Sequence, residues 1–245
     1  MRVRPTIRIV HQDAHLLVLE KPVGLATTAP EGGESLFELA RSLDPRAPAL
    51  HPLSRLDTQV SGLVTFARTS QGNHAAIAAR RAGKLRRAYL GLCHPAPASP
   101  EGEWREAIGI DPRDPTRRRA LPADTKGPAV KAAHTIYRVH ALAGPLCALD
   151  LFPRTGRTHQ LRVHASAAGS PLLGDVAYGG EKRLTLPNGR ILTAGRVMLH
   201  CGAFRMPDPA KPSATLTLSL PPPDDLATLW RSAGGDPAAL VLALT

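Results

Sequence analysis

Short connections between the predicted strands restrict this chain more than any other feature of its sequence. Strand-like runs of apolar or alternating residues occur at 7–10, 16–20, 62–67, 86–93, 133–140, 146–152 and 215–220. Most of the segments that join them are too short for the helical crossovers that neighbouring parallel strands require. We therefore expect an α+β fold, with a mixed, mainly antiparallel β-sheet and flanking helices.

The segments between the strands divide into helices and loops. The residue patterns predict helices at 34–43, 70–81, 157–168 and 225–233. Ser70 is expected to cap the second of these helices. Polar, glycine and proline residues predict loops at 24–33, 94–102 and 111–126, and the last of these is strongly basic.

Length and cysteine content bear on domain number and compartment. The 245 residues fit a single domain, with or without two lobes. No apolar run approaches the ~20 residues of a membrane helix, and the N-terminus does not resemble a signal peptide. The three cysteines are scattered and odd in number, which argues against a disulfide framework. We expect a cytoplasmic protein with reduced cysteines and no membrane association.

The net charge of the chain points to a polyanionic partner. Lys and Arg number 31 against 20 Asp and Glu, giving a formal charge of +11. Such a surplus attracts nucleic acids, although an arginine-rich composition explains it equally well. The chain has only four Phe, three Tyr and two Trp, which argues against an aromatic platform for single strands.

One candidate site lies in the stretch SRLDTQVSGLVTFAR, residues 54–68. Arg55 and Asp57 stand two residues apart on a polar turn, directly before an apolar strand. An aspartate in this position is commonly a turn residue or a cap. Functional groups are also often placed on loops at the end of a rigid sheet, so Asp57 is a candidate for chemistry.

A second candidate site lies in LFPRTGRTHQLRVHASAAGSPLLGD, residues 151–175. A helix that begins at Thr158 would carry a polar face and a core face. The polar face would include His159, Arg162, Val163 and Ser166, and the core face Leu161, Ala165 and Ala168. A solvated amphipathic helix explains this pattern.

The same stretch also suits a ligand. Arg154, Arg157, His159 and Arg162 gather where a loop enters a helix, and a helix N-terminus favours phosphate groups.

Together these stretches resemble the motifs of the RluA-type pseudouridine synthases. SRLDTQVSGLV resembles HRLDxxTSG, and TGRTHQLRVHASAAGSPLLGDVAYG resembles the segment GRTHQ-[IL]-RVH…LGDxxYG. HQDAHLLVLEKPVGL, KLRRAYLGL and, more loosely, KGPAVKAAHTIYRV resemble three further family segments. The resemblance runs from Ile9 to Leu199, which is most of the chain.

The resemblance implies a pseudouridine synthase catalytic fold with a central RNA-binding cleft. It implies one catalytic domain over residues 1–245, without the small N-terminal RNA-binding domain of many relatives. The implied activity is isomerisation of specific uridines in structured RNA, ribosomal or transfer RNA, to pseudouridine. We expect a monomer whose partner is RNA, and the resemblance implies no metal and no organic cofactor.

The resemblance also implies roles for single residues. Asp57 would be the catalytic carboxylate, and Arg162 would pair with it. Tyr89 would stack on the flipped uracil, although a tyrosine on a strand is more often a core residue. Arg55 would enter the RNA stack, which suits a reaction that must first flip the base out at a cost of a few kcal/mol.

Further basic residues are candidates for binding the RNA backbone. They are Arg157, His159, Lys84, Arg86 and Arg87, with the clusters Arg80–Arg81 and Arg117–Arg119. Taken singly, each of these clusters also fits a solvated basic face.

Departures from the family pattern leave other functions open. Ser54 stands where the family has His, Val60 where it has Thr, and Glu20 where it has Asn. The main alternative is therefore a catalytically weak or inactive RNA-binding or assembly factor on the same fold.

A hydrolase or metal enzyme is a third possibility. It lacks support, because the sequence has no GxSxG elbow. The HxxxH spacing of His11 and His15 would suit a metal only on a helix, and it spans a predicted hairpin turn.

Overall fold

A computed structural model describes residues 7–29, 33–47, 49–242 and 244 of the chain. Residues 30–32 of the loop expected at 24–33 lie outside the described residues. The chain forms two compact units. Unit 1 contains the residues up to Arg87 together with Cys201–Leu220. Unit 2 contains Ala88–His200 and Pro221–Ala243.

Unit 1 is built on a mainly antiparallel sheet. The strand order is β1, β2, β4 and β13, with β3 paired to β4 and β14 paired to β13. The strands are β1 (Arg8–Gln12), β2 (Leu16–Lys21), β3 (His51–Pro52), β4 (Ser61–Ala67), β13 (Leu199–Pro207) and β14 (Thr215–Ser219). Every residue of β4 is buried, as expected for a strand with neighbours on both sides. The hairpin predicted for the first two strands is confirmed.

Two helices, α1 (Leu36–Leu43) and α2 (Ser70–Arg81), belong to unit 1. The hydroxyl of Ser35 caps α1 by accepting the N–H of Glu38. The predicted cap of α2 was wrong by one residue, because Thr69 accepts the N–H of Gly72 at 3.1 Å and Ser70 is already helical. Both residues can cap, so composition could not choose between them.

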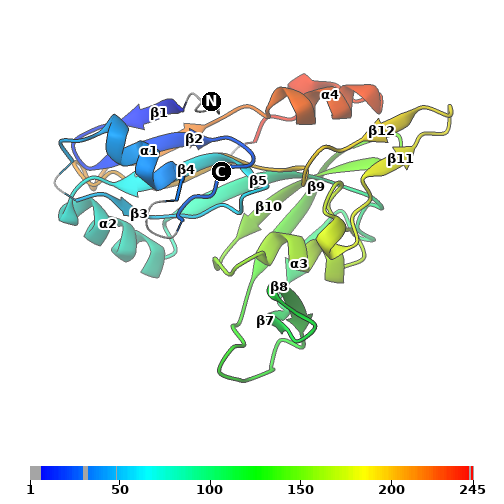
Figure 1. The fold of residues 1–245 in the computed structure, drawn as a ribbon, viewed down its shortest axis with the longest axis horizontal. Coiled ribbons are helices and arrows are strands. Elements are labelled where there is room, and N and C mark those ends of the chain that lie inside the picture. Colours follow the sequence, from blue (N-terminus) through cyan, green and yellow to red (C-terminus); the bar gives the residue numbers. More distant parts are fainter. Residues whose placement is uncertain (1–6, 30–32, 48, 243, 245) are drawn as a thin grey trace. The chain divides into compact units, whose positions relative to one another are not determined.

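Unit 2 has a sheet in the order β5, β10, β9 and β6, and each of these pairs is antiparallel. Its strands are β5 (Arg86–Cys93, from Ala88 onwards), β6 (Glu101–Trp104), β9 (Thr135–Ala143) and β10 (Leu146–Pro153). Two helices lie on opposite faces of this sheet (Figure 1), α3 (Gln160–Ala167) and α4 (Asp224–Ser232). The expected α+β class is confirmed.

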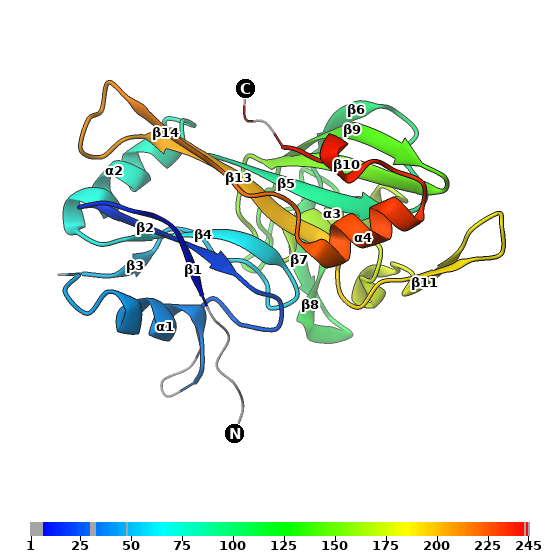
Figure 2. The same ribbon diagram turned by 90° about the horizontal axis from the view of Figure 1, so that it is seen from above.

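Smaller elements complete unit 2. They are the hairpins β7 (Ala107–Asp111) with β8 (Asp114–Leu121) and β11 (Arg183–Thr185) with β12 (Ile191–Thr193), and the 3-10 turns η1 (Val176–Tyr178) and η2 (Pro237–Ala239). Figure 2 shows η2 close to α4 near the C-terminal end of the chain. Arg196 fastens α4 through a bidentate ion pair with Asp225, at 2.6 and 2.9 Å.

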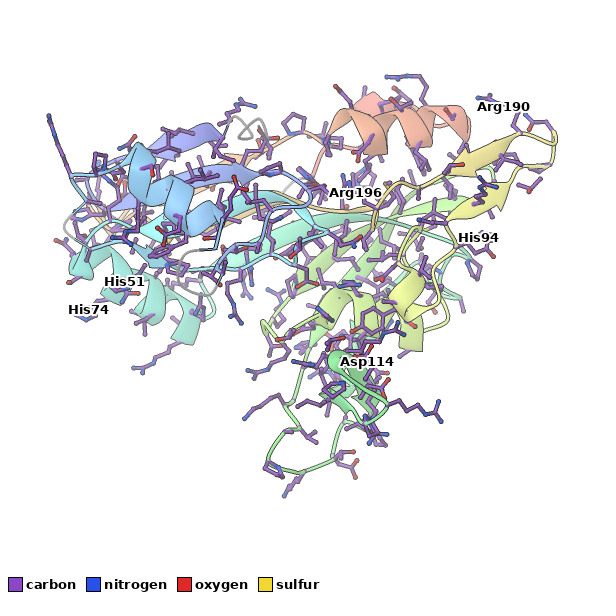
Figure 3. The ribbon with its side chains drawn as sticks, viewed as in Figure 1. His51, His74, His94, Asp114, Arg190 and Arg196 are labelled. Carbon is purple, nitrogen blue, oxygen red and sulfur yellow. The ribbon has the colours of Figure 1, made fainter. Side chains whose placement is uncertain are left out.

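The β7–β8 hairpin corrects one prediction. Residues 111–126 were expected to be a loop, yet β8 occupies 114–121. Figure 1 shows α3 between this hairpin and the sheet, and Asp114 marks the hairpin in Figure 3. Ile108 and Ala120 pack with Val163 of α3, so one apolar face holds an otherwise polar segment in strand form. That tertiary contact is not visible in the local sequence.

Helix α3 begins later than expected. His159 has φ 58° and ψ 17°, so the helix starts at Gln160 and His159 is not part of its polar face. Ala168 is exposed rather than part of the core, whereas Arg162 and His164 are buried. The structure therefore does not support the alternative of a solvated amphipathic helix, because residues 160–165 of α3 are buried.

Gly62 provides a test of the packing in unit 1. A methyl group at this residue would overlap the backbone of Cys201 on β13, and the backbone has φ +122°. Gly62→Ala should lower the free energy of unfolding by about 2–5 kcal/mol, from overpacking and a left-handed backbone. Urea denaturation would measure this loss.

The matched control is Gly195→Ala, at an exposed glycine with no atom near its missing methyl group. This control should change the free energy of unfolding by less than about 0.5 kcal/mol. Equal stabilities for the two variants would contradict the close approach of β4 and β13.

Candidate active site

The turn that carries Asp57 is fixed by hydrogen bonds on both sides. The hydroxyl of Thr27 donates to the carbonyl of Leu56 at 2.9 Å and accepts the N–H of the same residue at 3.0 Å. The N–H of Val60 donates to the carbonyl of Asp57 at 3.0 Å and closes a tight turn. Arg55 is exposed and Asp57 is half-buried. The carboxylate therefore stands on a rigid turn directly before the buried strand β4.

Lys21 also holds the turn that carries Asp57, a role that the sequence reasoning missed. Its side chain is fully buried, and Nζ donates to the carbonyls of Pro22 (2.8 Å), Leu25 (2.7 Å) and Thr58 (3.4 Å). Such hydrogen bonds are what a buried ammonium group requires. The N–H of Gly24 also donates to Thr58, at 2.8 Å. The KPVG part of the opening motif was the available signal.

The two departures beside Asp57 have structural roles. The hydroxyl of Ser54 accepts the N–H of Thr65 on β4 at 3.3 Å, next to a backbone bond from Leu53 to Thr65 at 2.8 Å. Val60 is 2% exposed and lies in the core. Ser54 thus extends the pairing along β4, and Val60 fills apolar space. Neither substitution removes the carboxylate or its supports.

In unit 2, a single loop holds Arg162. Nε and Nη2 of Arg162 donate to the two carboxylate oxygens of Asp175, each at 2.8 Å. Both side chains are buried, with Asp175 1% exposed. The guanidinium carbon also lies 4.8 Å from the ring centre of Tyr178, a cation–π distance. Asp175 thus binds the edge of the Arg162 guanidinium, and the ring of Tyr178 lies against its face.

Glycines let this loop approach its neighbours. A methyl group at Gly174 would overlap the carbonyl of Arg196, and one at Gly180 would overlap the carbonyl of Leu172. The carbonyl of Asp175 accepts the N–H groups of Tyr178 and Gly180, each at 2.9 Å. The GDVAYG stretch was visible in the sequence, but Asp175 and Tyr178 were missed as members of the site.

Gln160 holds the basic loop that precedes α3. Its Oε1 accepts the N–H of Arg157 at 3.0 Å and the hydroxyl of Thr155 at 2.7 Å. Its Nε2 donates to the carbonyl of His134 at 2.9 Å and to the hydroxyl oxygen of Thr135 at 3.0 Å. All four bonding positions of this buried amide are therefore used. Gln160 is a further positioning residue that the sequence reasoning missed.

The basic residues predicted to bind RNA fall into two groups. Lys84, Arg86 and Arg87 follow α2 in unit 1, where Lys84 is exposed and the two arginines are half-buried. Burial, and then the nearby charge of Arg87, lower the pKa of Arg80 on α2. In unit 2, Arg157 is exposed and His159 is half-buried, with Nδ1 of His159 2.6 Å from the hydroxyl of Tyr178.

The predicted catalytic residues are divided between the units. Asp57 lies in unit 1, while Tyr89 and Arg162 lie in unit 2. Tyr89 is 5% exposed on β5, where it pairs with Leu151 of β10. The joint action of these three residues stays a prediction.

The remaining candidate groups have ordinary partners. His11 lies 2.7 Å from a carboxylate oxygen of Asp13, and His15 lies 3.0 Å from the hydroxyl of Thr69. Across the described ranges, no three His, Cys, Asp or Glu side chains are grouped so that they could hold a metal ion. No helix in the described part of the chain is long and apolar enough to cross a membrane. The three cysteines are buried thiols outside any disulfide.

Comparison with known proteins identifies the family. The RNA pseudouridylate synthase family matches residues 15–167, which include both candidate sites except the loop around Asp175. A protein of Bacillus subtilis (strain 168) named uncharacterized RNA pseudouridine synthase YhcT is 32% identical over 197 residues, 77% of this chain. The ribosomal large subunit pseudouridine synthase D of Xylella fastidiosa (strain Temecula1) is 32% identical over 241 residues, 94% of this chain and 70% of that protein.

A solved structure agrees with the fold. The human RNA pseudouridylate synthase domain containing 4 protein superposes with a TM-score of 0.72, covers 92% of both chains and is 24% identical in sequence. The chain therefore belongs to the RNA pseudouridylate synthase family, and its relatives place it with the RluA-type members. It spans 62% of the length of the Bacillus subtilis relative.

The hydrogen-bond frame around α3 predicts a dependence of stability on pH. His164 is buried between the hydroxyl of Thr135 (2.9 Å) and the carbonyl of Glu106 (3.0 Å). Burial lowers the pKa of His164 below its usual value, so the unfolded chain binds the proton first as the pH falls. The stability present above the unfolded pKa near ~6.5 is lost as the pH falls toward the folded pKa.

His164→Gln keeps a donor and an acceptor but does not titrate. Urea unfolding at about pH 7.5 and about pH 5 should show a larger loss of stability in the wild type than in this variant. Equal losses in the two proteins would contradict the buried, neutral state of His164.

Proposed function

We propose that this protein isomerises uridine in RNA to pseudouridine, with Asp57 as the catalytic carboxylate. The observation that carries the proposal is the braced turn of Asp57, which lies within the region that matches the family. Asp57 is half-buried before β4, and hydrogen bonds at Leu56, Val60 and Thr58 hold the backbone around it. A fixed carboxylate of this kind suits attack on a sugar carbon or removal of a sugar proton.

The proposed reaction moves one bond of the nucleotide. The C1′–N1 glycosidic bond breaks, the uracil turns, and a C1′–C5 bond forms. The hydrogen on C5 leaves to solvent, and N1 gains a proton, so atoms and electrons balance. Asp57 begins the reaction as a carboxylate, either by adding to C1′ or by taking the 2′ proton on a route through a glycal.

Arg162 and Tyr89 are proposed to complete this chemistry. Arg162 would stabilise the ionised Asp57, and Asp175 and Tyr178 keep its guanidinium in one orientation. Tyr89 would stack on the flipped uracil. A rigid cation costs little reorganisation when charge moves in the transition state, which favours Arg162 for this role.

RNA binding is proposed to use the basic residues of both units. The enzyme must remove a uridine from its stack, which costs a few kcal/mol, and Arg55 is proposed to fill the space that is left. Lys84, Arg86, Arg87, Arg157 and His159 would hold the phosphates. Relatives named for the ribosomal large subunit favour ribosomal RNA over transfer RNA as the substrate. We propose that the protein acts as a monomer in the cytoplasm, a compartment that suits three cysteines outside any disulfide.

Asp57→Asn tests the proposed chemistry. This change removes the negative charge with little change in shape, so tritium release from RNA labelled at uracil C5 should fall by about 10³-fold or more, while RNA binding stays within about threefold. The control is Asp208→Asn, at another half-buried turn aspartate of unit 1, which should keep the wild-type rate.

Other outcomes of this experiment would favour different conclusions. RNA binding without tritium release in the wild type would support an RNA-binding or assembly factor instead. An Asp57→Asn variant as active as the wild type would move the reaction to another residue.

The basic cluster after α2 is tested by salt dependence. Lys84→Gln with Arg86→Gln removes two cations, so the slope of log K against log salt should become shallower by about 1.5. Lys182→Gln with Arg183→Gln is the control, because it removes the same charge from an exposed segment of unit 2. Equal slopes for both double variants would show that net charge, rather than this cluster, governs RNA binding.

A further inference from the structure

Tyr178 contacts three residues of unit 2, namely Arg162, Arg118 and His159. Its ring lies under the guanidinium of Arg162 at 4.8 Å, and its hydroxyl accepts the N–H of Arg118 on β8 at 3.0 Å. The same hydroxyl lies 2.6 Å from Nδ1 of His159. One side chain on the 175–180 loop thus touches both the proposed catalytic cation and a proposed RNA-binding residue.

The hydrogen bonds of this hydroxyl favour one tautomer of His159. A backbone N–H can only donate, so the oxygen of Tyr178 accepts from Arg118. The hydroxyl proton can then be donated to Nδ1 of His159, 2.6 Å away. In that arrangement neutral His159 carries its own proton on Nε2, which makes Nε2 a hydrogen-bond donor.

The backbone of His159 gives independent evidence that this residue is held in place. It is the one non-glycine residue with positive φ in the described part of the chain. A left-handed backbone is unfavourable for a residue with a Cβ atom, and it persists where surrounding contacts fix it. The ring of His159 meets the ring of Tyr178 edge-on at 5.7 Å, in addition to their hydrogen bond.

We propose that Tyr178 is a positioning residue of this site. Its ring keeps Arg162 in one orientation, and its hydroxyl keeps His159 as the Nε2–H tautomer, a donor suited to an RNA phosphate or carbonyl oxygen. The effect on turnover rests on the proposed function, whereas the effect on His159 does not. Tyr178 itself takes no part in making or breaking a bond.

The tautomer is tested in the protein without RNA. Long-range ¹⁵N–¹H NMR of the histidine rings should show His159 with an unprotonated Nδ1 in the wild type and a mixture of tautomers in Tyr178→Phe. The control is Tyr137→Phe, which removes the hydroxyl of a buried tyrosine of unit 2 that stacks on Trp104; it should leave His159 unchanged. A protonated Nδ1 in the wild type, or no change in Tyr178→Phe, would overturn the proposal.

Measurements of turnover separate the role of the Tyr178 hydroxyl from that of its ring. Tyr178→Phe keeps the ring, so the rate of tritium release at saturating RNA should stay within about threefold, while KM rises about 2–10-fold through His159. Tyr178→Leu removes the ring and should slow the saturated rate by about tenfold or more. Thermal melting would show that each variant is folded.

A double-mutant cycle shows whether Tyr178 acts through Arg162. In an Arg162→Lys background, adding Tyr178→Leu should cost less than about threefold in rate, because the stacked guanidinium is already gone. Fully additive losses would overturn the proposed link. If the wild type releases no tritium, the proposed function fails, and the NMR result still decides the role of Tyr178.

Discussion

The buried ion pair of Arg162 and Asp175 is the interaction on which the rest of unit 2 depends. Taking two charges out of water is expensive, and here the cost is offset by a bidentate geometry in which both carboxylate oxygens accept an N–H at 2.8 Å. Removing one partner of such a pair typically costs about 3–5 kcal/mol, because the other charge stays buried. The pair joins α3 to the 175–180 loop, and Tyr178 on that loop joins both to β8.

Much of the fold could be predicted because it follows from local pattern. The strands from residues 86 to 93 and 146 to 152 are mainly apolar in sequence, and they form β5 and β10 within one residue of their expected ends. The β7–β8 hairpin could not be predicted in this way. Its second strand contains three successive arginines, and it is held extended by pairing with β7 and by the packing of Ile108 and Ala120 against α3.

In the candidate site, too, the residues in local motifs could be predicted and those that depend on distant contacts could not. Asp57 and Arg162 were found because they stand in distinctive motifs. Their supports were missed because they depend on contacts between distant segments. Gln160 bonds to His134 and Thr135, more than twenty residues earlier in the chain, and nothing near Gln160 marks those partners. Ser54 looked like a weakness of the site, yet its hydroxyl completes the pairing with β4.

The central claim is that this chain converts uridine to pseudouridine, and nucleoside analysis tests it most directly. Unmodified ribosomal RNA would be incubated with the protein, digested to nucleosides and separated by chromatography. The account predicts that pseudouridine appears as uridine disappears in equal amount, at a small number of sites per molecule. Tight RNA binding with no pseudouridine formed, on ribosomal and transfer RNA alike, would contradict it.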